Sequence, residues 1–510
     1  TEKKVLDVIL AAREGGEGGR CLYHAITDCG AGGFSSAVGE MGEHLGAIVD
    51  LERAPVKYAG LTPTEIWISE AQERMVLAVA PEDVPALEAL CREHEVELCD
   101  LGVFGTEDRE LILRYEGREM GRMSMGLLHD GLPMPEREAR WTPADDAAPA
   151  AEAAAAPPAA ADALTALLTH PNIASKHWII RQYDHEVQGG SVVKPLVGPE
   201  QDGPSDAAVI RPVPASSQGL GIACGLATGF RADPYRMTLA AVDECVRNLV
   251  CTGVDPDRIA ILDNFCFPSC RKPENLGSLV LAAEACHDAA VAYRTPFISG
   301  KDSLNNQFTT EHGVTIEIPP TLLVSGFGIV PDLHAACTMD AKASGTLLVI
   351  VGETRSGLAG SHLAMLGLAP EATLSGGPPM TDLEAGPRRA RAVARVIAEG
   401  VARAAHDCSE GGVLLAASEM AMAGRLGLEL DLTLLPTDGE LDPLEERFAE
   451  TPSRYLLEVE RVRLDDLDAA LGGEPYAVIG RFTGAHQSVR DAAAGVDVSL
   501  DSLLAAWRGT

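Results

Sequence analysis

The sequence predicts a mixed α/β fold, with α+β character, in which two homologous domains flank a different middle domain. The first observation behind this prediction is a repeated stretch: residues 28–33 read DCGAGG, and residues 407–412 read DCSEGG. The second is an alternation of short apolar runs with amphipathic helical patterns, which is typical of layered structures. Together they predict a duplicated fold.

The repeat extends well beyond the two glycine-rich stretches. Matched residues follow one another in the same order, and the spacing between the copies stays nearly constant. In chain order the pairs include Ala37 with Ala416, Glu40 with Glu419, Met41 with Met420, Leu45 with Leu426, Asp50 with Asp431, Glu70 with Glu450, Arg74 with Arg454 and Gly102 with Gly480. Chance is a poor explanation for so many matches in one register.

The repeated stretch has the pattern of a strand end, a turn and a helix start. Its glycines permit backbone conformations that other residues resist. After them Phe34, Ala37, Val38 and Met41 recur at helical spacing. A helix N-terminus suits an anion such as phosphate, and a carboxylate beside it suits a bridging metal ion. The alternative is a loop that only packs a helix on a sheet, and the duplicated aspartate makes the two interpretations about equal.

Length and composition place the chain among folded globular proteins. Its 510 residues suffice for about three domains, and 46% hydrophobic with 23% charged residues is ordinary for a protein with a core. The net charge of −34 argues against nucleic-acid binding, and a nucleotide site would need metal ions and local donors. No apolar run suggests a membrane segment. Twelve scattered cysteines without CxxC pairs indicate reduced thiols and a cytoplasmic location.

Residues 1–142 form the first repeated domain in this interpretation. The chain opens at a Thr and directly enters a helical pattern, so we expect that preceding sequence is missing. Strands are predicted at 25–27, 48–51, 76–79 and 98–104, and helices from Phe34 to Leu45 and over 85–93.

Residues 143–163 consist almost entirely of Ala, Pro and Asp, and we expect a linker there. Asp162 is a candidate cap for a helix over residues 163–168.

The unrepeated middle domain covers residues 164–338. Strands are predicted at 205–210, 259–264 and from Phe297, and helices over 234–252 and 276–290. On the first of these helices Glu244 and Asn248 stand at i and i+4 and project from one face. Oxygen ligands on one helix face can hold a hard cation. A solvated face or a buried polar pair is the alternative, and these two residues alone favour it.

Two strands of the middle domain end in polar residues. Asp263 closes the first, and the second leads into Gly300, Lys301, Asp302 and Ser303. A lysine and a hydroxyl after a glycine suit a phosphate, but the GxxxxGK spacing of a P-loop is absent. An ordinary polar turn explains the cluster equally well.

The second repeated domain covers residues 339–485. It contains a predicted buried strand over 347–352 and a long helix over 388–405, directly before the second copy of the repeated stretch. Residues 486–510 are expected to form a short tail with a helical pattern over 500–507.

These motifs resemble those of phosphoribosylformylglycinamidine synthase, the large subunit of the fourth step of purine biosynthesis. The resemblance covers nearly everything except the linker and the tail. It is carried by residues 69–75 (SEAQERM), 170–176 (HPNIASK), 181–185 (RQYDH), 205–209 (SDAAV), 300–304 (GKDSL) and 406–412 (HDCSEGG). The resemblance implies a duplicated aminoimidazole ribonucleotide synthetase fold with the domain order A1-B1-A2-B2. This chain resembles B1, A2 and B2, which implies that A1 is absent.

The resemblance also implies an activity. In this family ATP phosphorylates the amide oxygen of formylglycinamide ribonucleotide, and ammonia from glutamine displaces the phosphate to give the amidine, with Mg²⁺ as cofactor. The family's catalytic histidines belong to A1, so no catalytic residue is expected in this chain. The implied partners are a separate glutaminase subunit, a small bridging subunit and an A1-containing chain.

Residue by residue, the family pattern assigns one set of positions to the reaction site. Asp28 matches a Mg²⁺ ligand, Glu70, Ala71, Gln72 and Ser303 match substrate contacts, and Asp263 and Gly300 match ATP contacts. Lys301 stands where shorter members have a metal-binding Asn, so we expect a direct phosphate contact there. Ala71 is a second departure from the family pattern.

A second, non-turning-over nucleotide site is implied by the longer members of the family. Asp206, Glu244, Asn248 and Asp407 match its Mg²⁺ ligands, and Ser409 lies near its nucleotide. His185 matches an active-site histidine of A1 and is expected to be a structural remnant.

Three functional hypotheses follow. The first is part of an ATP-dependent amidine-forming ligase. The second is another ATP-using kinase or synthetase of the same superfamily, and the repeat argues against it because those enzymes are unduplicated. The third is a non-catalytic nucleotide-binding or scaffold subunit that works only with a partner that supplies A1.

Overall fold

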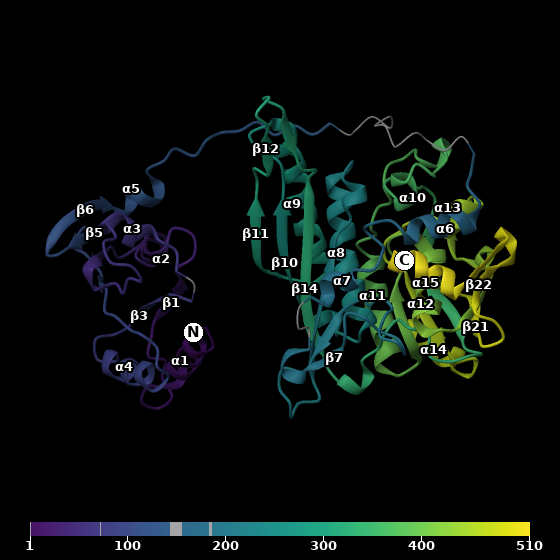
Figure 1. The fold of residues 1–510 in the computed structure, drawn as a ribbon, viewed down its shortest axis with the longest axis horizontal. Helices are drawn as coiled ribbons and strands as arrows, with labels where there is room; N and C mark the ends of the chain where they lie inside the picture. Colours follow the sequence, from purple (N-terminus) through teal and green to yellow (C-terminus); the bar gives the residue numbers. More distant parts are fainter. Residues whose placement is uncertain (1, 72, 143–155, 183–185, 510) are drawn as a thin grey trace. The chain divides into compact units, whose positions relative to one another are not determined.

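The computed structural model describes residues 2–71, 73–142, 156–182 and 186–509, which divide into two compact units (Figure 1). The first unit covers Thr1–Glu136 and the second Arg137–Thr510. Each unit is described by itself. Within the described residues, no helix combines the length and the apolar character that crossing a membrane requires.

The first unit combines a four-stranded sheet, order β4-β2-β5-β6, with the separate antiparallel pair β1-β3. Buried apolar residues of α2, β2 and β5 form its main core, and α1 packs on α4 in a smaller one. Its helices are α1 (Glu2–Glu14), α2 (Phe34–Met41), α3 (Pro63–Ile68), α4 (Val84–Glu93) and α5 (Met125–Asp130). Its strands are β1 (Ala25–Asp28), β2 (Ala47–Asp50), β3 (Met75–Ala78), β4 (Gly102–Phe104), β5 (Glu110–Tyr115) and β6 (Arg118–Ser124).

The middle of the chain, within the second unit, builds a six-stranded sheet of order β11-β10-β14-β9-β8-β7. Every second residue of β14 is buried, because α8 packs on β14 and β9 from one side and α9 packs on α8. The elements are α6 (Ala160–Leu168), α7 (His177–Ile180), β7 (Ser191–Val193), β8 (Ala208–Ile210), β9 (Gly219–Gly225), α8 (Pro234–Cys251), β10 (Ile259–Cys266), α9 (Pro273–Tyr293), β11 (Phe297–Ser303), β12 (Gln307–Thr309), β13 (Thr315–Glu317) and β14 (Thr321–Val330).

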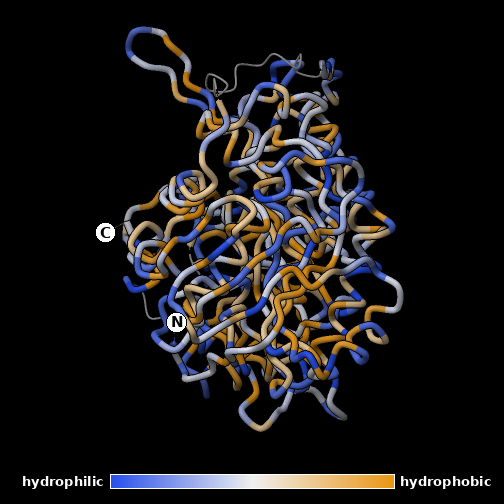
Figure 2. Tube along the Cα trace, turned by 90° about the vertical axis from the view of Figure 1, so that its right-hand side faces the viewer, coloured by the Kyte–Doolittle hydropathy of each residue, from blue (hydrophilic) through white to orange (hydrophobic). Residues whose placement is uncertain are grey.

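The C-terminal part of the second unit builds a seven-stranded sheet of order β17-β20-β15-β21-β18-β22-β23. Hydrophobic stretches run through its interior, and hydrophilic ones lie at outer turns (Figure 2). Its strands are β15 (Leu347–Val351), β16 (Thr354–Arg355), β17 (Ala402–Asp407), β18 (Gly427–Leu430), β19 (Thr437–Asp438), β20 (Tyr455–Val459), β21 (Tyr476–Thr483), β22 (Ser488–Asp491) and β23 (Val496–Ser499). Its helices are α10 (His362–Met365), α11 (Ala385–Ala398), α12 (Gly412–Gly424), α13 (Pro443–Phe448), α14 (Leu464–Leu471) and α15 (Leu500–Arg508).

The predicted duplication is confirmed by matching contacts in the two copies. The N–H of Cys29 donates to the carbonyl of Arg74 at 3.0 Å, and the N–H of Cys408 donates to that of Arg454 at 3.2 Å. Both arginines also donate to a backbone carbonyl five residues upstream. A capping box with proline at the first helical position opens both α3 and α13. Equivalent sequence positions therefore make the same backbone connections.

Several predicted boundaries are wrong. The helix expected over 388–405 ends at Ala398, because Gly400 takes a positive φ of 62° and the chain then enters β17. Residues 300–303, expected to be a loop, continue β11 because they pair with β10. The strands expected at 98–104 and 205–210 shorten to β4 and β8.

Two further differences concern the linker helix and the tail. Asp162 lies inside the first turn of α6, whose N-cap is Ala159, so it does not cap that helix. Residues 486–510 contain the predicted helix α15 and also the strands β22 and β23, which extend the seven-stranded sheet.

Candidate functional site

Asp407 ends strand β17 directly before a tight turn into helix α12. β17 pairs antiparallel with β20, so Asp407 lies opposite Tyr455. Gly411 and Gly412 both take positive φ. A Cβ atom at Gly412 would stand 2.7 Å from the carbonyl oxygen of Arg447, so only glycine fits this approach. The turn thereby sets the Asp407 carboxylate near the N-terminus of α12.

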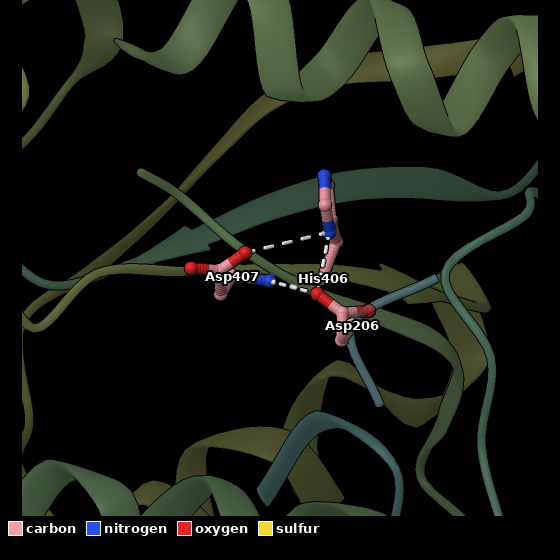
Figure 3. A group of neighbouring side chains, drawn as sticks. All are labelled: Asp206, His406 and Asp407. Carbon is pink, nitrogen blue, oxygen red and sulfur yellow. Dashed lines mark hydrogen bonds and ion pairs between the residues drawn. The ribbon is translucent and has the colours of Figure 1, made fainter. Parts of the chain in front are cut away.

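Asp206 meets this turn from the segment before β8 (Figure 3). Its Oδ1 accepts hydrogen bonds from His406 Nδ1 at 2.7 Å and from the N–H of Asp407 at 3.1 Å. Its Oδ2 is buried, points away from His406 and has no hydrogen-bond partner among the described residues (Figure 3). Ligand atoms of Asp206, His406 and Asp407 lie within 4.8 Å of one another.

Both ring nitrogens of His406 face carboxyl groups. Burial alone lowers its pKa, but the carboxylate of Asp206 and that of Glu419, whose Oε2 lies 3.3 Å from Nε2, raise the pKa of His406 well above its ordinary value. The imidazole is thus engaged at both nitrogens, and the carboxylates of Asp206 and Asp407 supply the oxygen donors of this group.

The predicted pair on helix α8 is oriented by hydrogen bonds, and Asn248 is buried whereas Glu244 is half-buried. Glu244 Oε2 accepts from the N–H of Leu226 at 2.8 Å, and Asn248 Nδ2 donates to the carbonyl of Cys224 at 3.0 Å. Burial, with the nearby carboxylates of Glu410 and Asp407, raises the pKa of Glu244 well above its ordinary value. The solvated-face alternative is thus wrong, although Glu244 lies outside the close group of Asp206 and Asp407.

Arg247 lies on the same helix between Glu244 and Asn248, and sequence reasoning missed it. Its side chain is only 3% exposed. One edge of the guanidinium pairs with Asp243, while Nη2 donates to Ser409 Oγ at 2.6 Å and to Asp407 Oδ2 at 3.3 Å. Helix α8 is thereby joined to the repeated turn by charge-assisted hydrogen bonds.

A cavity opens between helix α8 and the repeated turn. It encloses about 390 Å³ of empty space, counting the part open to solvent. Its polar lining residues are Thr228, Glu244, Arg247, His362, Ser409, Glu410 and Glu450. Three of these residues are glutamates, beside one arginine and one histidine.

Hydrogen bonds hold the carboxylate of Glu450 in this cavity, whereas burial raises the pKa of Glu410 there. Glu450 Oε1 accepts from the N–H groups of Gly411 and His362, at 2.7 and 2.8 Å, and from His362 Nδ1 at 3.1 Å. Burial opposes a charge on His362, but Glu450 raises its pKa. Burial raises the pKa of Glu410 to about 7, with His362 opposing and the carboxylates of Glu450 and Asp407 adding to the shift.

The four side chains expected to bind a divalent ion fit that role chemically. Each is oriented at one atom by the contacts above, and each keeps one oxygen without a hydrogen-bond donor in the described part of the chain: Asp206 Oδ2, Asp407 Oδ1, Glu244 Oε1 and Asn248 Oδ1. Carboxylate and amide oxygens are the ligands that hard cations such as Mg²⁺ prefer.

The second predicted group lies on strands β10 and β11. The two strands pair in parallel, with Asp263 opposite Gly300 and Cys266 opposite Ser303. A Cβ atom at Gly300 would lie 2.3 Å from Asp263 Oδ1, so the glycine makes room for the carboxylate. Burial raises the pKa of Asp263, and a hydrogen bond from the backbone of Lys301 opposes this.

The exposed side of the same strands carries a cation. Lys301 Nζ donates to Ser303 Oγ at 3.0 Å, and the lysine is exposed. Asp263, Gly300, Lys301 and Ser303 thus share one edge of the six-stranded sheet. They form a group separate from that around Asp407.

The predicted residues of the first unit lie on two connections, the repeated turn after β1 and the segment between α3 and β3. Asp28 ends β1 and is exposed, and its Oδ1 accepts from the N–H of Gly30 at 2.8 Å. Glu70 and Ala71 are exposed on the connection between α3 and β3. Gln72 and His185 lie outside the described residues.

Comparison with protein-family models agrees with this architecture. A model described as AIR synthase related protein, C-terminal domain, matches residues 1–113 and 343–492, slightly more than half of the chain. A model described as AIR synthase related protein, N-terminal domain, matches residues 204–330. The chain belongs to the AIR synthase related protein family.

Within the AIR synthase related family, the chain is homologous to the phosphoribosylformylglycinamidine synthase subunit PurL. It is 33% identical over 489 residues to the protein of Thermococcus sibiricus, covering 94% of this chain and 63% of the relative. It is 34% identical over 523 residues to that of Deinococcus radiodurans, covering 99% and 66%. The chain thus spans slightly less than two thirds of the length of these relatives.

A solved structure shares the fold. T. maritima PurL complexed with ADP superposes with a TM-score of 0.63 at 23% identity, covering 94% of this chain and 67% of that chain. The likeness confirms the predicted fold class, in which two segments of the AIR synthase C-terminal type flank one of the N-terminal type.

Sequence reasoning on this AIR synthase related chain missed Arg247, His362 and Glu410 as parts of the site. Arg247 had a signal, because it stands three residues after Glu244 on the same helix. Glu410 lies inside the repeated turn, and it also could have been found. His362 had no signal, because it belongs to none of the motifs that the sequence offered.

Proposed function

We propose that this chain carries part of an ATP-dependent C–N ligase, which converts formylglycinamide ribonucleotide and ammonia to formylglycinamidine ribonucleotide in purine biosynthesis. The observation that carries the proposal is the duplicated strand–turn–helix with an aspartate at the strand end, in a chain about one third identical to PurL over nearly its whole length. Turns of this kind suit phosphate and magnesium binding.

The proposed reaction has two steps. The γ-phosphoryl group of ATP passes to the amide oxygen of the substrate, which yields ADP and an iminophosphate. Ammonia then attacks the same carbon and phosphate leaves, which forms the amidine. Bound Mg²⁺ would neutralise charge on the transferring phosphoryl group. The catalytic acid–base groups are expected on a domain of the A1 type.

The residues of the β10–β11 edge are proposed to bind ATP. The exposed ammonium of Lys301, beside Ser303, offers donors to phosphate, and Gly300 lets the chain approach closely. Asp263 is the proposed second ATP contact, and Ser303 the substrate contact. The structure of T. maritima PurL complexed with ATP supports a nucleotide ligand for this family.

The repeated turn of the first unit is proposed to hold substrate and metal. Asp28 has one oxygen oriented by the N–H of Gly30, which leaves the exposed carboxylate available to Mg²⁺. Glu70, Ala71 and Gln72 are the proposed contacts to formylglycinamide ribonucleotide. T. maritima PurL complexed with FGAR supports this substrate class.

The group around Asp407 is proposed as a second Mg–nucleotide site. Asp206, Glu244, Asn248 and Asp407 would hold the metal through their free oxygens, and Ser409 would face the nucleotide from the lining of the cavity. These side chains are already oriented by hydrogen bonds, so little reorganisation is needed for binding.

A domain of the A1 type is proposed to cover the open face of the six-stranded sheet. On β9, Ile222 is 43% exposed and Cys224 is exposed, whereas the neighbouring Gly221 faces α8. An apolar sheet face of this kind needs a partner layer. That domain would come from another chain or from sequence N-terminal to Thr1.

The ammonia source is proposed to be a separate glutaminase subunit, with a small bridging subunit. The structure of PurLQS from Thermotoga maritima supports a three-component assembly. A cytoplasmic location is proposed with it, because all twelve cysteines are free thiols.

Activity measurements test the proposal. The chain is assayed for ADP and amidine formation with ATP, formylglycinamide ribonucleotide and ammonium, alone and with an A1-containing fragment. We expect turnover only in the mixture. Turnover by the chain alone would show that no catalytic group is missing.

Protein variants tested in the same assay distinguish the ligase hypothesis from the hypothesis of a scaffold that only binds nucleotide. Gly300→Ala should abolish turnover in the mixture, and Gly484→Ala, whose added Cβ meets only ordinary contacts, serves as its control. If Gly300→Ala lowers nucleotide binding but leaves the rate of the mixture unchanged, the scaffold hypothesis is favoured.

A further inference from the structure

A permanently charged side chain lies in the interior of the group around Asp407. The guanidinium of Arg247 serves two carboxylates at once, Asp243 at one edge and Asp407 at the other, and it also donates to Ser409. Its Nε is buried without a hydrogen-bond partner among the described residues. Ion pairs and charge-assisted hydrogen bonds thus fix the Arg247 side chain. Helix α8, which carries it, belongs to the middle domain, whereas the turn belongs to the second repeated domain.

The two carboxylates depend on Arg247 to different degrees. Asp243 also accepts hydrogen bonds from the N–H and the Oγ of Ser453, at 2.8 and 2.6 Å, and from Tyr293. Among the described residues, Asp407 Oδ2 accepts only from the Ser409 hydroxyl besides Arg247, and Asp407 Oδ1 lies 3.8 Å from His406 Nδ1. Removal of the guanidinium would therefore leave mainly the Asp407 carboxylate without a counter-ion.

The surroundings of Asp407 are acidic. Several carboxyl groups share a few basic side chains here, which include Arg247 beside Asp407, His406 beside Asp206, His362 beside Glu450 and Lys176 near Glu410. The carboxylates are Asp206, Asp243, Glu244, Asp407, Glu410, Glu419 and Glu450. A buried carboxylate without a counter-ion costs several kcal/mol, so each cation in this region matters for folding.

We propose that Arg247 is a resident cation of this site, whose guanidinium takes the place of one divalent ion beside Asp407. The wild-type site therefore stays ordered without metal, and it takes up fewer metal ions than its carboxylates would otherwise bind. This inference goes beyond the proposed ligase, because it concerns charge balance and requires neither turnover nor bound nucleotide.

An arginine suits this role better than a lysine. The planar guanidinium presents two donor edges, and here one edge serves Asp243 while the other serves Asp407 and Ser409. A single ammonium at the end of a lysine cannot reach both sets of acceptors with the same geometry. The site is thus built around a fork-shaped cation.

The experiment compares Arg247→Gln with a matched control, Arg454→Gln. Arg454 is equally buried, but its partners are the neutral oxygens of Thr354, Ala449 and Thr451. The full chain and both variants are unfolded thermally in EDTA and in excess Mg²⁺. Bound Mn²⁺ is counted by electron paramagnetic resonance.

We expect both variants to lose about 5 °C or more in Tm in EDTA. Mg²⁺ should recover at least half of the loss for Arg247→Gln and none of it for Arg454→Gln. Arg247→Gln should bind one Mn²⁺ more per chain than the wild type. Equal Mn²⁺ counts, or equal recovery in the two variants, would overturn the proposal.

A double variant keeps the proposal testable if Arg247→Gln does not fold. Asp407→Asn added to Arg247→Gln removes the uncompensated charge, so the double variant should fold in EDTA and gain nothing from Mg²⁺. A double variant that fails to fold, or that is no more stable in EDTA than Arg247→Gln, would show that Arg247 acts through packing and not as a cation.

Discussion

The carboxylate of Asp206 accepts a hydrogen bond of 2.7 Å from the imidazole of His406, although 200 residues separate them in the chain. Both side chains are buried, and they belong to different domains of the second unit. A charged pair in this setting is sensitive to the removal of either partner, because the other charge then remains buried alone. The contact therefore ties the middle domain to the second repeated domain.

Asp206→Asn should lower the free energy of unfolding of the second unit by about 3 kcal/mol, since it removes the shortest carboxylate contact of the His406 imidazole and leaves Glu419 at 3.3 Å and Asp407 at 3.8 Å. Chemical denaturation followed by circular dichroism measures this change. Asp257→Asn is the control, because Asp257 pairs with Arg391 at the surface and should cost less than about 1 kcal/mol. Equal losses in the two variants would contradict the assigned role of the buried pair.

Glu410→Gln should stabilise the protein at pH 8 and have little effect at pH 4. Burial raises the pKa of Glu410 to about 7, whereas an unfolded glutamate titrates near about 4.3. A raised carboxyl pKa contributes stability that is full below the unfolded value and is lost as the pH rises through the folded value. A glutamine escapes this loss, so the expected gain is about 3 kcal/mol.

Urea denaturation across this pH range checks the prediction. The difference between wild type and variant isolates Glu410 from the other charged groups that face it: Lys176, Glu244, His362, Asp407 and Glu450. Glu399→Gln, at an exposed position, should change stability equally at every pH. A gain for Glu410→Gln that is the same at pH 4 and pH 8 would exclude ionisation as its cause.

Gly300→Ala should weaken nucleotide binding about tenfold or more, because the added Cβ would lie 2.3 Å from Asp263 Oδ1 and must displace that carboxylate. Isothermal titration calorimetry with Mg–ADP measures the affinity. Gly484→Ala, where the nearest atom is Ser344 Oγ at 3.5 Å, should bind as the wild type does. If the affinity of Gly300→Ala is unaltered, the β10–β11 edge does not contact nucleotide.

Glu450→Gln and Glu70→Gln should behave oppositely although they are matched positions of the repeat. Glu450 is held by two backbone N–H groups and His362, so its replacement should cost on the order of 2 kcal/mol of stability. Glu70 is exposed, so its replacement should change stability by less than about 0.5 kcal/mol. Substrate binding should instead be lost in Glu70→Gln, and denaturation together with calorimetry distinguishes the two effects.

The duplication and the residue types of the candidate site could be predicted from sequence, because repetition in one register needs no knowledge of the fold. Asp407 was found in this way, whereas Glu244 was found through its i, i+4 spacing with Asn248 and through the family resemblance. Arg247 was missed because its partner Asp407 lies 160 residues away, and its helix pattern does not distinguish an ion-pairing arginine from a surface one. Pairing between distant side chains follows from packing, which local patterns do not contain.

The predicted boundaries of several helices and strands were wrong for a related reason. Residues 300–303 look like a polar turn, and they form strand because β10 offers a parallel partner with free backbone groups. The alanine-rich segment before Asp407 has high helix propensity, yet Ala402–Asp407 pairs with β20 in the sheet. Tertiary hydrogen bonding outweighed local preference at both places.

The arginine that braces each repeated turn, Arg74 or Arg454, donates to main-chain oxygens upstream of it. Because the backbone conformation of the turn depends on these main-chain acceptors, neighbouring side chains can be substituted without a change in that conformation. After a gene duplication that starts from such a turn, one copy can keep an exposed glutamate, as at Glu70, while the other uses the matching glutamate, Glu450, to hold backbone N–H groups. The two copies of the repeat can then diverge in sequence while every intermediate protein still folds.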